Sequence, residues 1–310
     1  MDLPAALAAA KPGDTLRIPA GRYPVNLIID KSITLLGVGQ VVLDGTHRGS
    51  VLRIQAPGGA VTLSALMLVG GAADEAGGGV AVMNGDVELI DCTLRFNKAP
   101  QYGGGGLYVR HGRTRVTRCR IEANTGRQGG GVLVDDVAEL SMRDSTIVQN
   151  AAVDGGGLRV KEGGKAALLG CTIADNKVVG DAAKGSAVSL AGTSSRAPAV
   201  ALKACVVSER RESPSCLFNE SKYPGALTLI HNVLPPWCAR LGGKNTFAEA
   251  GFVGSGSEPY LLSETSPARG AGEAADFGPD ARDVRGEPRD NPPSLGAFAY
   301  VRPSASRLGY

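Results

Sequence analysis

Aromatic side chains make up only 5% of this 310-residue chain, and its six cysteines include no C-x-x-C pair. So few cysteines argue against a disulfide-built scaffold, and the missing pair argues against a zinc or redox motif. No apolar run approaches the roughly 18 residues that cross a bilayer. A net charge of +3 without a basic cluster argues against nucleic-acid binding. The G-x-S-x-G elbow and the H-E-x-x-H zinc motif are also missing, so no complete catalytic signature is present.

Glycine, by contrast, is abundant at 44 residues, and its clusters recur at intervals of 26 residues. The clusters begin at Gly77, Gly103, Gly129 and Gly155. A fixed period of this size predicts a solenoid, and the recurrence makes the glycines turn residues, not a phosphate loop. Within each repeat, apolar residues such as Val80 and Val82 alternate with other residues at period 2. This alternation predicts two or three short strands per coil, stacked into parallel sheets.

Positions one repeat apart form columns across the coils. Two apolar columns are predicted to face the core, namely Val80/Leu107/Val132/Leu158 and Leu94/Ile121/Ile147/Ile173. A third column of small interior residues contains Cys92, Cys119, Ser145 and Cys171 and continues to Cys205, and its regularity argues against a metal site. A fourth column, Asn97/Asn124/Asn150/Asn176, is predicted to form an amide ladder from coil to coil.

These "GGG…CTI…N" repeats resemble a right-handed, single-stranded parallel β-helix of the pectate-lyase-like superfamily, and bacterial surface β-helix proteins of the choice-of-anchor type in particular. The opening "AALAAAKPGDTLRIPAGRYPVNLIIDKSITLLGVG" is similar to the start of such proteins, where a short helix caps the solenoid; Asp2 and Pro4 suit its first turn. The segments "AGFVGSGSEPYLLSETSPARGAG" and "DVRGEPRDNPPSLGAFAY" resemble their C-terminal part, which closes the last coils. The resemblance implies an all-β fold, but the fold hosts lyases, glycosidases, epimerases and adhesins.

The expected organisation follows from these patterns. Residues 1–13 are predicted to form the helical cap and residues 14–210 the coils, with the regular 26-residue repeats at 77–184. Residues 211–300 are expected to form irregular coils and the closure, and 301–310 a tail.

A block of charge follows the first strand of three successive repeats. Its two columns are Arg110/Asp135/Lys161 and His111/Asp136/Glu162. Neighbouring parallel strands lie about 4.8 Å apart, so these side chains are expected to be close together. In a regular strand Asp135 and Asp136 would point to opposite faces, so a simple acid pair requires a turn at this point.

The resemblance suggests a polysaccharide lyase site in this block. Lys161 would be the base that removes the C5 proton of a uronate, Arg110 the acid or the carboxylate clamp, and His111 a further catalytic candidate. Asp135, Asp136 and Glu162 would be ligands for Ca²⁺. Tyr108, Arg159 and Asp135 are the candidates for binding substrate, and Tyr102, Tyr108 and Trp237 are the aromatic rings available for stacking on a sugar.

A charge ladder without a site is the alternative interpretation. Parallel strands place like positions side by side, so charges that alternate in sign along a column stabilise it. The chain does this elsewhere, in the column Asp91/Arg118/Asp144 and in the pair Arg95/Glu122. Exposed pairs of this kind contribute roughly 0–1 kcal/mol each.

For function we therefore expect an exported, monomeric protein that binds or processes an extended, anionic polysaccharide or cell-surface glycan. The alternative is a non-catalytic surface adhesin or assembly module. Whether the protein is an enzyme stays open; as an enzyme it would be a polysaccharide lyase or a glycoside hydrolase, the latter using paired carboxylates. The first residues lack a basic segment and do not form a signal peptide. We expect an extracellular or cell-surface location, with the cytoplasm as the alternative. Cys216 and Cys238 flank one strand-like stretch and could pair in an exported protein.

Overall fold

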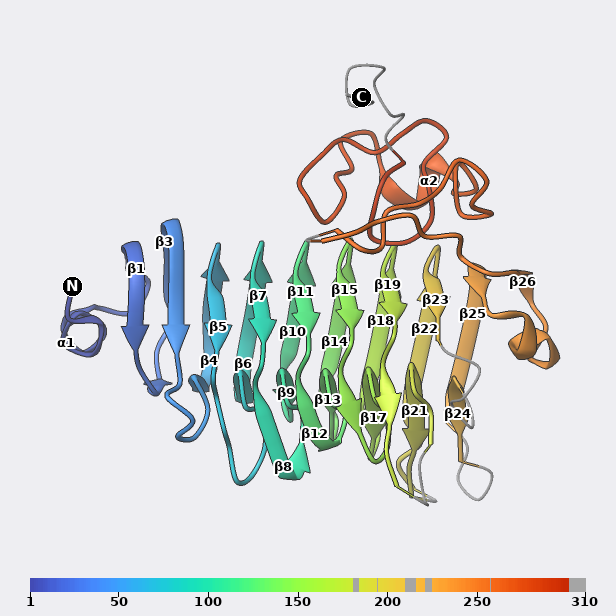
Figure 1. The fold of residues 1–310 in the computed structure, drawn as a ribbon. Helices are drawn as coiled ribbons and strands as arrows, with labels where there is room; N and C mark the ends of the chain where they lie inside the picture. The colour runs from blue at the N-terminus through green and yellow to red at the C-terminus, as the bar shows by residue number, and fades with distance from the viewer. Residues whose placement is uncertain (181–183, 194, 210–215, 221–224, 257, 301–310) are drawn as a thin grey trace.

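The computed structural model describes residues 1–180, 184–193, 195–209, 216–220, 225–256 and 258–300, so the predicted tail at 301–310 lies outside the described residues. The chain folds as a right-handed parallel β-helix with one short helix at its N-terminal end, as the sequence predicts (Figure 1). No helix in the described residues is long and apolar enough to span a membrane.

The N-terminal helix α1, Leu3–Ala9, covers the first coil. Asp2 is its N-cap, because the side-chain carboxylate accepts a hydrogen bond from the amide of Ala5 at 3.0 Å. Leu3 and Leu7 lie one turn apart on the same side of the helix and are both buried against the solenoid core. The cap therefore closes the apolar interior at the open end, where an unpaired strand edge would otherwise be exposed.

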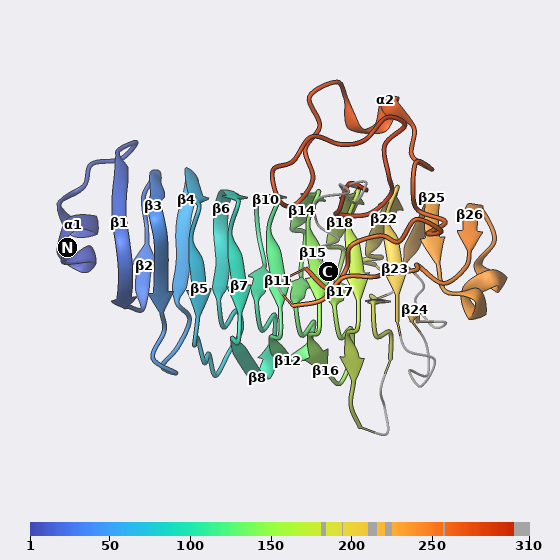
Figure 2. The ribbon, with the colours of Figure 1, turned by 45° about the horizontal axis from the view of Figure 1, so that its top comes forward.

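Each coil contributes strands to three long parallel faces, which lie side by side from coil to coil (Figure 2). The first face holds β2 Leu27–Ile29, the first part of β4 Leu52–Ser64 and of β6 Val80–Ile90, β9 Leu107–Val109, β13 Val132–Val134, β17 Leu158–Lys161, β21 Val188–Ala191 and β24 Leu217–Asn219. The second face holds β1 Thr15–Pro24, β3 Ile33–Asp44, the last parts of β4 and β6, β10 Arg113–Thr117, β14 Glu139–Arg143, β18 Lys165–Leu169, β22 Ala199–Lys203 and β25 Ala226–Leu234. The third face holds the ends of β1 and β3, then β5 Met67–Val69, β7 Thr93–Arg95, β11 Arg120–Glu122, β15 Thr146–Val148, β19 Thr172–Ala174 and β23 Val206–Ser208. A separate four-stranded sheet holds β8 Lys98–Gly103, β12 Thr125–Gln128, β16 Ala151–Ala152 and β20 Lys177–Val178.

The predicted columns occupy the interior. Both apolar columns are fully buried, and the cysteines of the third column are buried with free thiols. The asparagines form the predicted ladder. The Nδ2 groups of Asn97, Asn124 and Asn150 each donate to the Oδ1 of the next asparagine at 3.0 Å and to a backbone carbonyl of the preceding coil. The ladder therefore satisfies buried amides and fixes the register of successive coils.

Parallel pairing continues past residue 210, within the segment predicted to form irregular coils. β24 pairs with β21, β25 pairs with β22, and β26, Lys244–Phe247, pairs with β25. Pairing persists because the same alternation of inward and outward residues continues in β25. The 3₁₀ helix η1, Pro236–Leu241, precedes β26, and a disulfide joins Cys238 of this helix to Cys216.

Residues 248–256 and 258–300 form what we call the C-terminal arm, which contains the helix α2, Ala274–Phe277. The arm lies along the side of the solenoid rather than over its end, as the red ribbon in Figure 1 shows, and this differs from the expected closure of the last coils. Outward positions of the third face explain the difference. They are charged at Arg95 and Glu122 but apolar at Val148 and Ala174, and Phe298 of the arm packs on that apolar pair.

Candidate functional site

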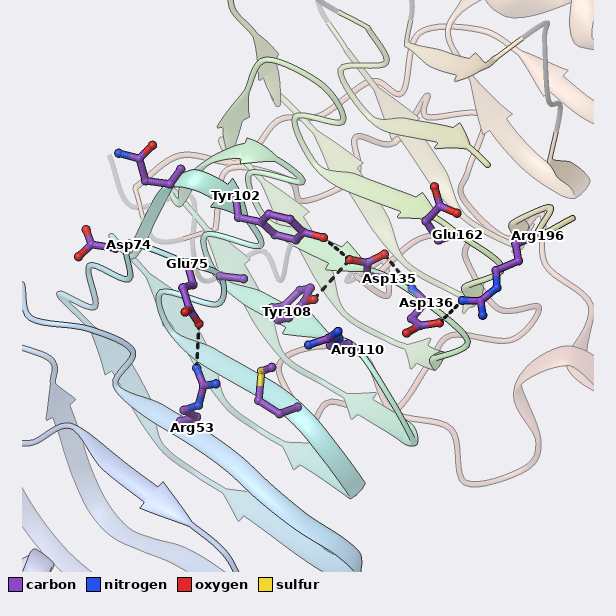
Figure 3. A pocket seen from close by; sticks show the side chains of 13 residues that line it. Arg53, Asp74, Glu75, Tyr102, Tyr108, Arg110, Asp135, Asp136, Glu162 and Arg196 are labelled. Atoms are coloured by element: carbon purple, nitrogen blue, oxygen red, sulfur yellow. Dashed lines mark hydrogen bonds and ion pairs between the residues drawn. The ribbon is translucent and has the colours of Figure 1, made fainter. Parts of the chain in front are cut away.

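A cleft of about 640 Å³ runs across successive coils at the end of the first face. Figure 3 shows that its walls come from several coils, with Tyr102 of β8 on one side and Arg196 on the other. Its charged and aromatic lining consists of Arg53, Asp74, Glu75, Tyr102, Tyr108, Arg110, Asp135, Asp136, Glu162 and Arg196. The cleft therefore includes four members of the charge block that the sequence singles out.

Strand register brings these residues together. Val134 pairs with Val109 on one side and with Val160 on the other, so the residues that follow, Asp135, Arg110 and Lys161, stand in one column as predicted. The chain turns directly after Asp135, and Asp136 has a left-handed backbone with φ of 52°. This turn is what allows two adjacent acids to line the same cleft, which a straight strand would prevent.

Asp135 lies at the centre of a buried polar cluster. Its Oδ2 accepts hydrogen bonds from the hydroxyls of Tyr102 at 2.6 Å and Tyr108 at 3.3 Å, and lies 3.5 Å from Nζ of Lys161. Its Oδ1 accepts the backbone amide of Asp136 at 2.8 Å. Burial, and then the neighbouring Asp135 carboxylate, raises the pKa of Tyr108 above its ordinary value, so this phenol remains a proton donor. The Asp135 charge is thus compensated by one ammonium and three hydrogen-bond donors.

Lys161 lies beneath Tyr102 and is not among the residues that line the cleft. Its Nζ donates to the Tyr102 hydroxyl at 2.8 Å and sits 4.4 Å from the centre of the tyrosine ring. Tyr102 is 39% exposed and lines the cleft, whereas the Lys161 side chain is 16% exposed and does not line it. The predicted base is therefore held behind Tyr102, and the tyrosine hydroxyl is the member of this pair that reaches the cleft.

Asp136 is paired on both sides. Arg196 approaches its Oδ1 at 2.6 Å, and Nε2 of His111 lies 3.5 Å from its Oδ2. His111 does not line the cleft. These contacts give His111 and Arg196 the role of holding the turn at Asp136.

Arg110 differs from Lys161, the other cation of its column. Its side chain is exposed and lines the cleft, and among the described residues its guanidinium has no hydrogen-bond or ion-pair partner. The ladder interpretation holds elsewhere: Arg118 pairs with Asp91 through two bonds of 2.7 and 2.8 Å, and Arg95 lies 3.4 Å from Glu122. The Arg110 column does not neutralise itself in this way, so one cation is left for a ligand.

Arg159 was predicted to bind substrate, but the structure places it inside the protein and outside the cleft lining. Its guanidinium is paired with Asp154 at 2.8 Å and bonded to the hydroxyl of Ser189. Burial lowers the pKa of Arg159, while the Asp154 carboxylate acts in the opposite direction. Arg159 lies between Leu158 and Val160 on a strand that is buried on both faces. The side of the strand that the alternation predicts to face solvent is therefore buried, and Arg159 with it. Trp237, a stacking candidate, instead packs against the solenoid core.

The three acids predicted to bind Ca²⁺ do not form a cation cage. In the described part of the chain, the carboxylate oxygens of Asp135, Asp136 and Glu162 do not converge within 4.8 Å of one another. Both oxygens of Asp135 are already occupied by donors, and Asp136 is paired with Arg196. A Ca²⁺ site requires six to eight oxygen ligands at 2.3–2.6 Å. The residues present therefore do not fit the ion.

Sequence reasoning missed Arg53, Asp74, Glu75 and Arg196 as lining residues, and it identified Tyr102 only as a stacking ring. Arg53 lies 3.5 Å from Glu75 across the mouth of the cleft. All of them precede or follow the regular repeats or lie in the longest strand of the small sheet. The Asp74-Glu75 pair, which only Ala76 separates from the first glycine cluster, was the one available signal.

The family model of the right-handed β-helix region matches residues 74–234, just over half of the chain. Among solved structures, the crystal structure of pectate lyase Pel9A is similar, with 13% sequence identity and a TM-score of 0.55 over 97% of this chain and 91% of that chain. At this identity the likeness establishes the fold alone. No curated protein gives a significant match to the sequence.

Proposed function

Because the chain belongs to the right-handed β-helix family, we propose that it binds an extended polysaccharide in the cleft and that Arg110 grips an acidic sugar there. The unpaired guanidinium of Arg110 is the observation that carries this proposal. The similar pectate lyase is named for a polysaccharide, which supports the ligand class. The extracellular location expected from the sequence remains a prediction.

The shape of the cleft suits a polymer. Its lining residues come from successive coils, which repeat about every 4.8 Å along the solenoid axis, so an extended chain can meet one coil after another. The exposed ring of Tyr102 offers a flat apolar surface for a sugar ring beside Arg110.

The charge layout favours isolated acidic sugars over a run of them. Glu75, Asp135 and Asp136 each have a cationic partner within 3.5 Å. Asp74 and Glu162 have none among the described residues, and both line the cleft with Arg110. When one sugar carboxylate binds Arg110, a carboxylate on the neighbouring sugar would face the unpaired acids Asp74 and Glu162 and be repelled. A neutral sugar at that position can instead donate hydrogen bonds from its hydroxyls to these acids. We therefore favour a glycan in which uronates alternate with neutral sugars.

Binding tests this proposal directly. The full chain is titrated with three fluorescently labelled polymers: a polyuronate, an alternating uronate–hexosamine polymer and a neutral glucan. Arg110→Gln is compared with Arg115→Gln, a matched change at an exposed arginine outside the cleft on β10. We expect tightest binding of the alternating polymer, at least a tenfold loss in Arg110→Gln and no change in Arg115→Gln. Equal loss in both variants, or no binding of any polymer, would refute the cleft assignment.

A second candidate function, β-elimination of the bound uronate, rests on the position of Tyr102. Its hydroxyl is bonded to Lys161 and Asp135 and reaches the cleft. The C5 proton would pass to Oη of Tyr102 while the phenolic proton moves to Asp135. The C5–H electron pair would form the C4–C5 double bond, and the C4–O bond would break with a proton from water on the leaving oxygen. Arg110 would neutralise the sugar carboxylate.

The ultraviolet absorbance of unsaturated sugars distinguishes the two candidates. Absorbance that appears with the wild type and vanishes in Tyr102→Phe supports elimination. A bound polymer that yields neither absorbance nor new reducing ends refutes elimination and leaves a non-catalytic glycan-binding protein.

A further inference from the structure

A second cluster of chemically active side chains shares no residue with the cleft and lies where α2 of the C-terminal arm meets β25 of the solenoid. His231 comes from β25, Glu273 is the residue before α2, and Asp276 lies within α2. Nδ1 of His231 lies 3.4 Å from Oε1 of Glu273, and one ligand atom from each of the three residues falls within 4.8 Å of the others.

Two atoms of this cluster are buried without a hydrogen-bond partner among the described residues: Nδ1 of His231 and Oδ2 of Asp276. The Asp276 side chain is only 4% exposed. Its other oxygen, Oδ1, is bonded to Nζ of Lys203 at 2.7 Å, which fixes the carboxylate and leaves Oδ2 as the oxygen without a described partner. A buried acceptor left without a partner costs about 1–3 kcal/mol. The cluster therefore holds one imidazole nitrogen and one carboxylate oxygen that are buried, can each ligate a metal, and make no hydrogen bond within the described part of the chain.

We propose that His231, Glu273 and Asp276 bind a divalent first-row transition metal ion, with Zn²⁺ as the representative member. One imidazole nitrogen and two carboxylate oxygens form a donor set that suits Zn²⁺, whereas Ca²⁺ and Mg²⁺ prefer oxygen alone. Ligands bonded to a tetrahedral Zn²⁺ at about 2.0–2.1 Å lie about 3.3 Å from one another. The His231–Glu273 separation of 3.4 Å already meets this requirement.

The ion would fasten the arm to the solenoid. Its ligands come from residues more than forty positions apart in the sequence, one on a coil strand and two on the arm. Binding to the folded chain and not to the unfolded one raises stability with ion concentration. The arm should therefore become more resistant to proteolysis when the ion is bound.

Isothermal titration of the chelator-treated full chain with Zn²⁺ tests the site. We expect one tightly bound ion per chain and at least tenfold weaker binding in Glu273→Gln. That side chain is 61% exposed, so its replacement leaves the fold intact. His231→Ala should abolish this binding, whereas His47→Ala, at an exposed histidine in a distant turn, should not change it.

Limited proteolysis gives a second measurement. Zn²⁺ should slow cleavage of the arm in the wild type and in His47→Ala but not in Glu273→Gln. Absence of Zn²⁺ binding in the wild type would reduce the cluster to a His231–Glu273 ion pair and overturn the proposal. Unchanged binding in Glu273→Gln and His231→Ala would place the ion elsewhere and overturn it equally.

Discussion

Replacing Glu209 by glutamine should remove a pH dependence from the stability of the solenoid. Glu209 occupies the position after Asn176 in the asparagine ladder, and its Oε1 accepts the Asn176 Nδ2–H at 3.0 Å. The residue is only 4% exposed, and among the described residues its Oε2 has no partner. Burial raises the pKa of Glu209 to about 8, against the opposing effect of the Asn176 hydrogen bond.

The sign of the effect follows from proton uptake. Between pH 4.5 and about 8 the folded state holds a proton on Glu209 that the unfolded state releases. Stability linked to Glu209 is therefore complete below pH 4.5, falls as pH rises, and is lost above about pH 8. At about 1.36 kcal/mol per pH unit, this interval corresponds to an upper bound of about 5 kcal/mol. Glutamine keeps the acceptor for Asn176 and has no proton to release.

The assay is denaturant unfolding of wild type and Glu209→Gln at pH 5 and pH 9. The wild type should lose several kcal/mol relative to the variant between these conditions. Glu139→Gln is the control, because Glu139 is an exposed partner of Lys165 and should shift stability by no more than about 1 kcal/mol at either pH. Parallel pH profiles for wild type and Glu209→Gln would refute the reasoning.

Three further changes test the ladder, the arm and the cleft. Asn124→Ala should cost at least about 3 kcal/mol in denaturant unfolding, since it leaves several buried ladder groups without partners, and a loss under about 1 kcal/mol would contradict the ladder's importance. Asp144→Ala should lower the free energy of unfolding by about 3–5 kcal/mol and make the arm more sensitive to limited proteolysis. The Arg289 guanidinium lies 2.6 Å from Asp144 and is 3% exposed, so the substitution leaves a buried cation without its anion. An unchanged proteolysis rate would argue against this contact as the anchor of the arm. Tyr102→Phe keeps the ring over Lys161 and should change unfolding by only about 1 kcal/mol while abolishing any elimination activity; activity that survives would exclude the hydroxyl.

Columns were predictable because a parallel solenoid has a fixed register. Once the 26-residue period is recognised, the position of each residue above its neighbour follows, and pairs such as Arg118 with Asp91 are found where the sequence places them. The asparagine and cysteine columns were predictable for the same reason. A regular repeat therefore allows contacts between neighbouring coils to be predicted from the sequence.

Contacts between segments outside the repeat could not be predicted in this way. Tyr102 reaches Asp135 from 33 positions away because β8 is longer than its counterparts β12, β16 and β20, and strand length is not visible in the glycine spacing. Arg289 reaches Asp144 from 145 positions away, and no periodicity connects the arm to the coils. The role of Glu209 was not predicted. The sequence shows only that the asparagine column ends at Asn176, and not that the Glu209 carboxyl group accepts the hydrogen bond of its amide.

These exceptions share a physical cause. A perfect repeat places identical side chains about 4.8 Å apart, so identical charges along a column repel and each must be neutralised by an alternating neighbour. A charge becomes available to a ligand only where that alternation fails. Arg110 is such a case. Its neighbour on one side of the column is the neutral Met83, and its neighbour on the other side is Asp135, whose carboxylate is already paired with Tyr102 and Lys161. The same break in the repeat that engages Asp135 is therefore what leaves Arg110 free to bind.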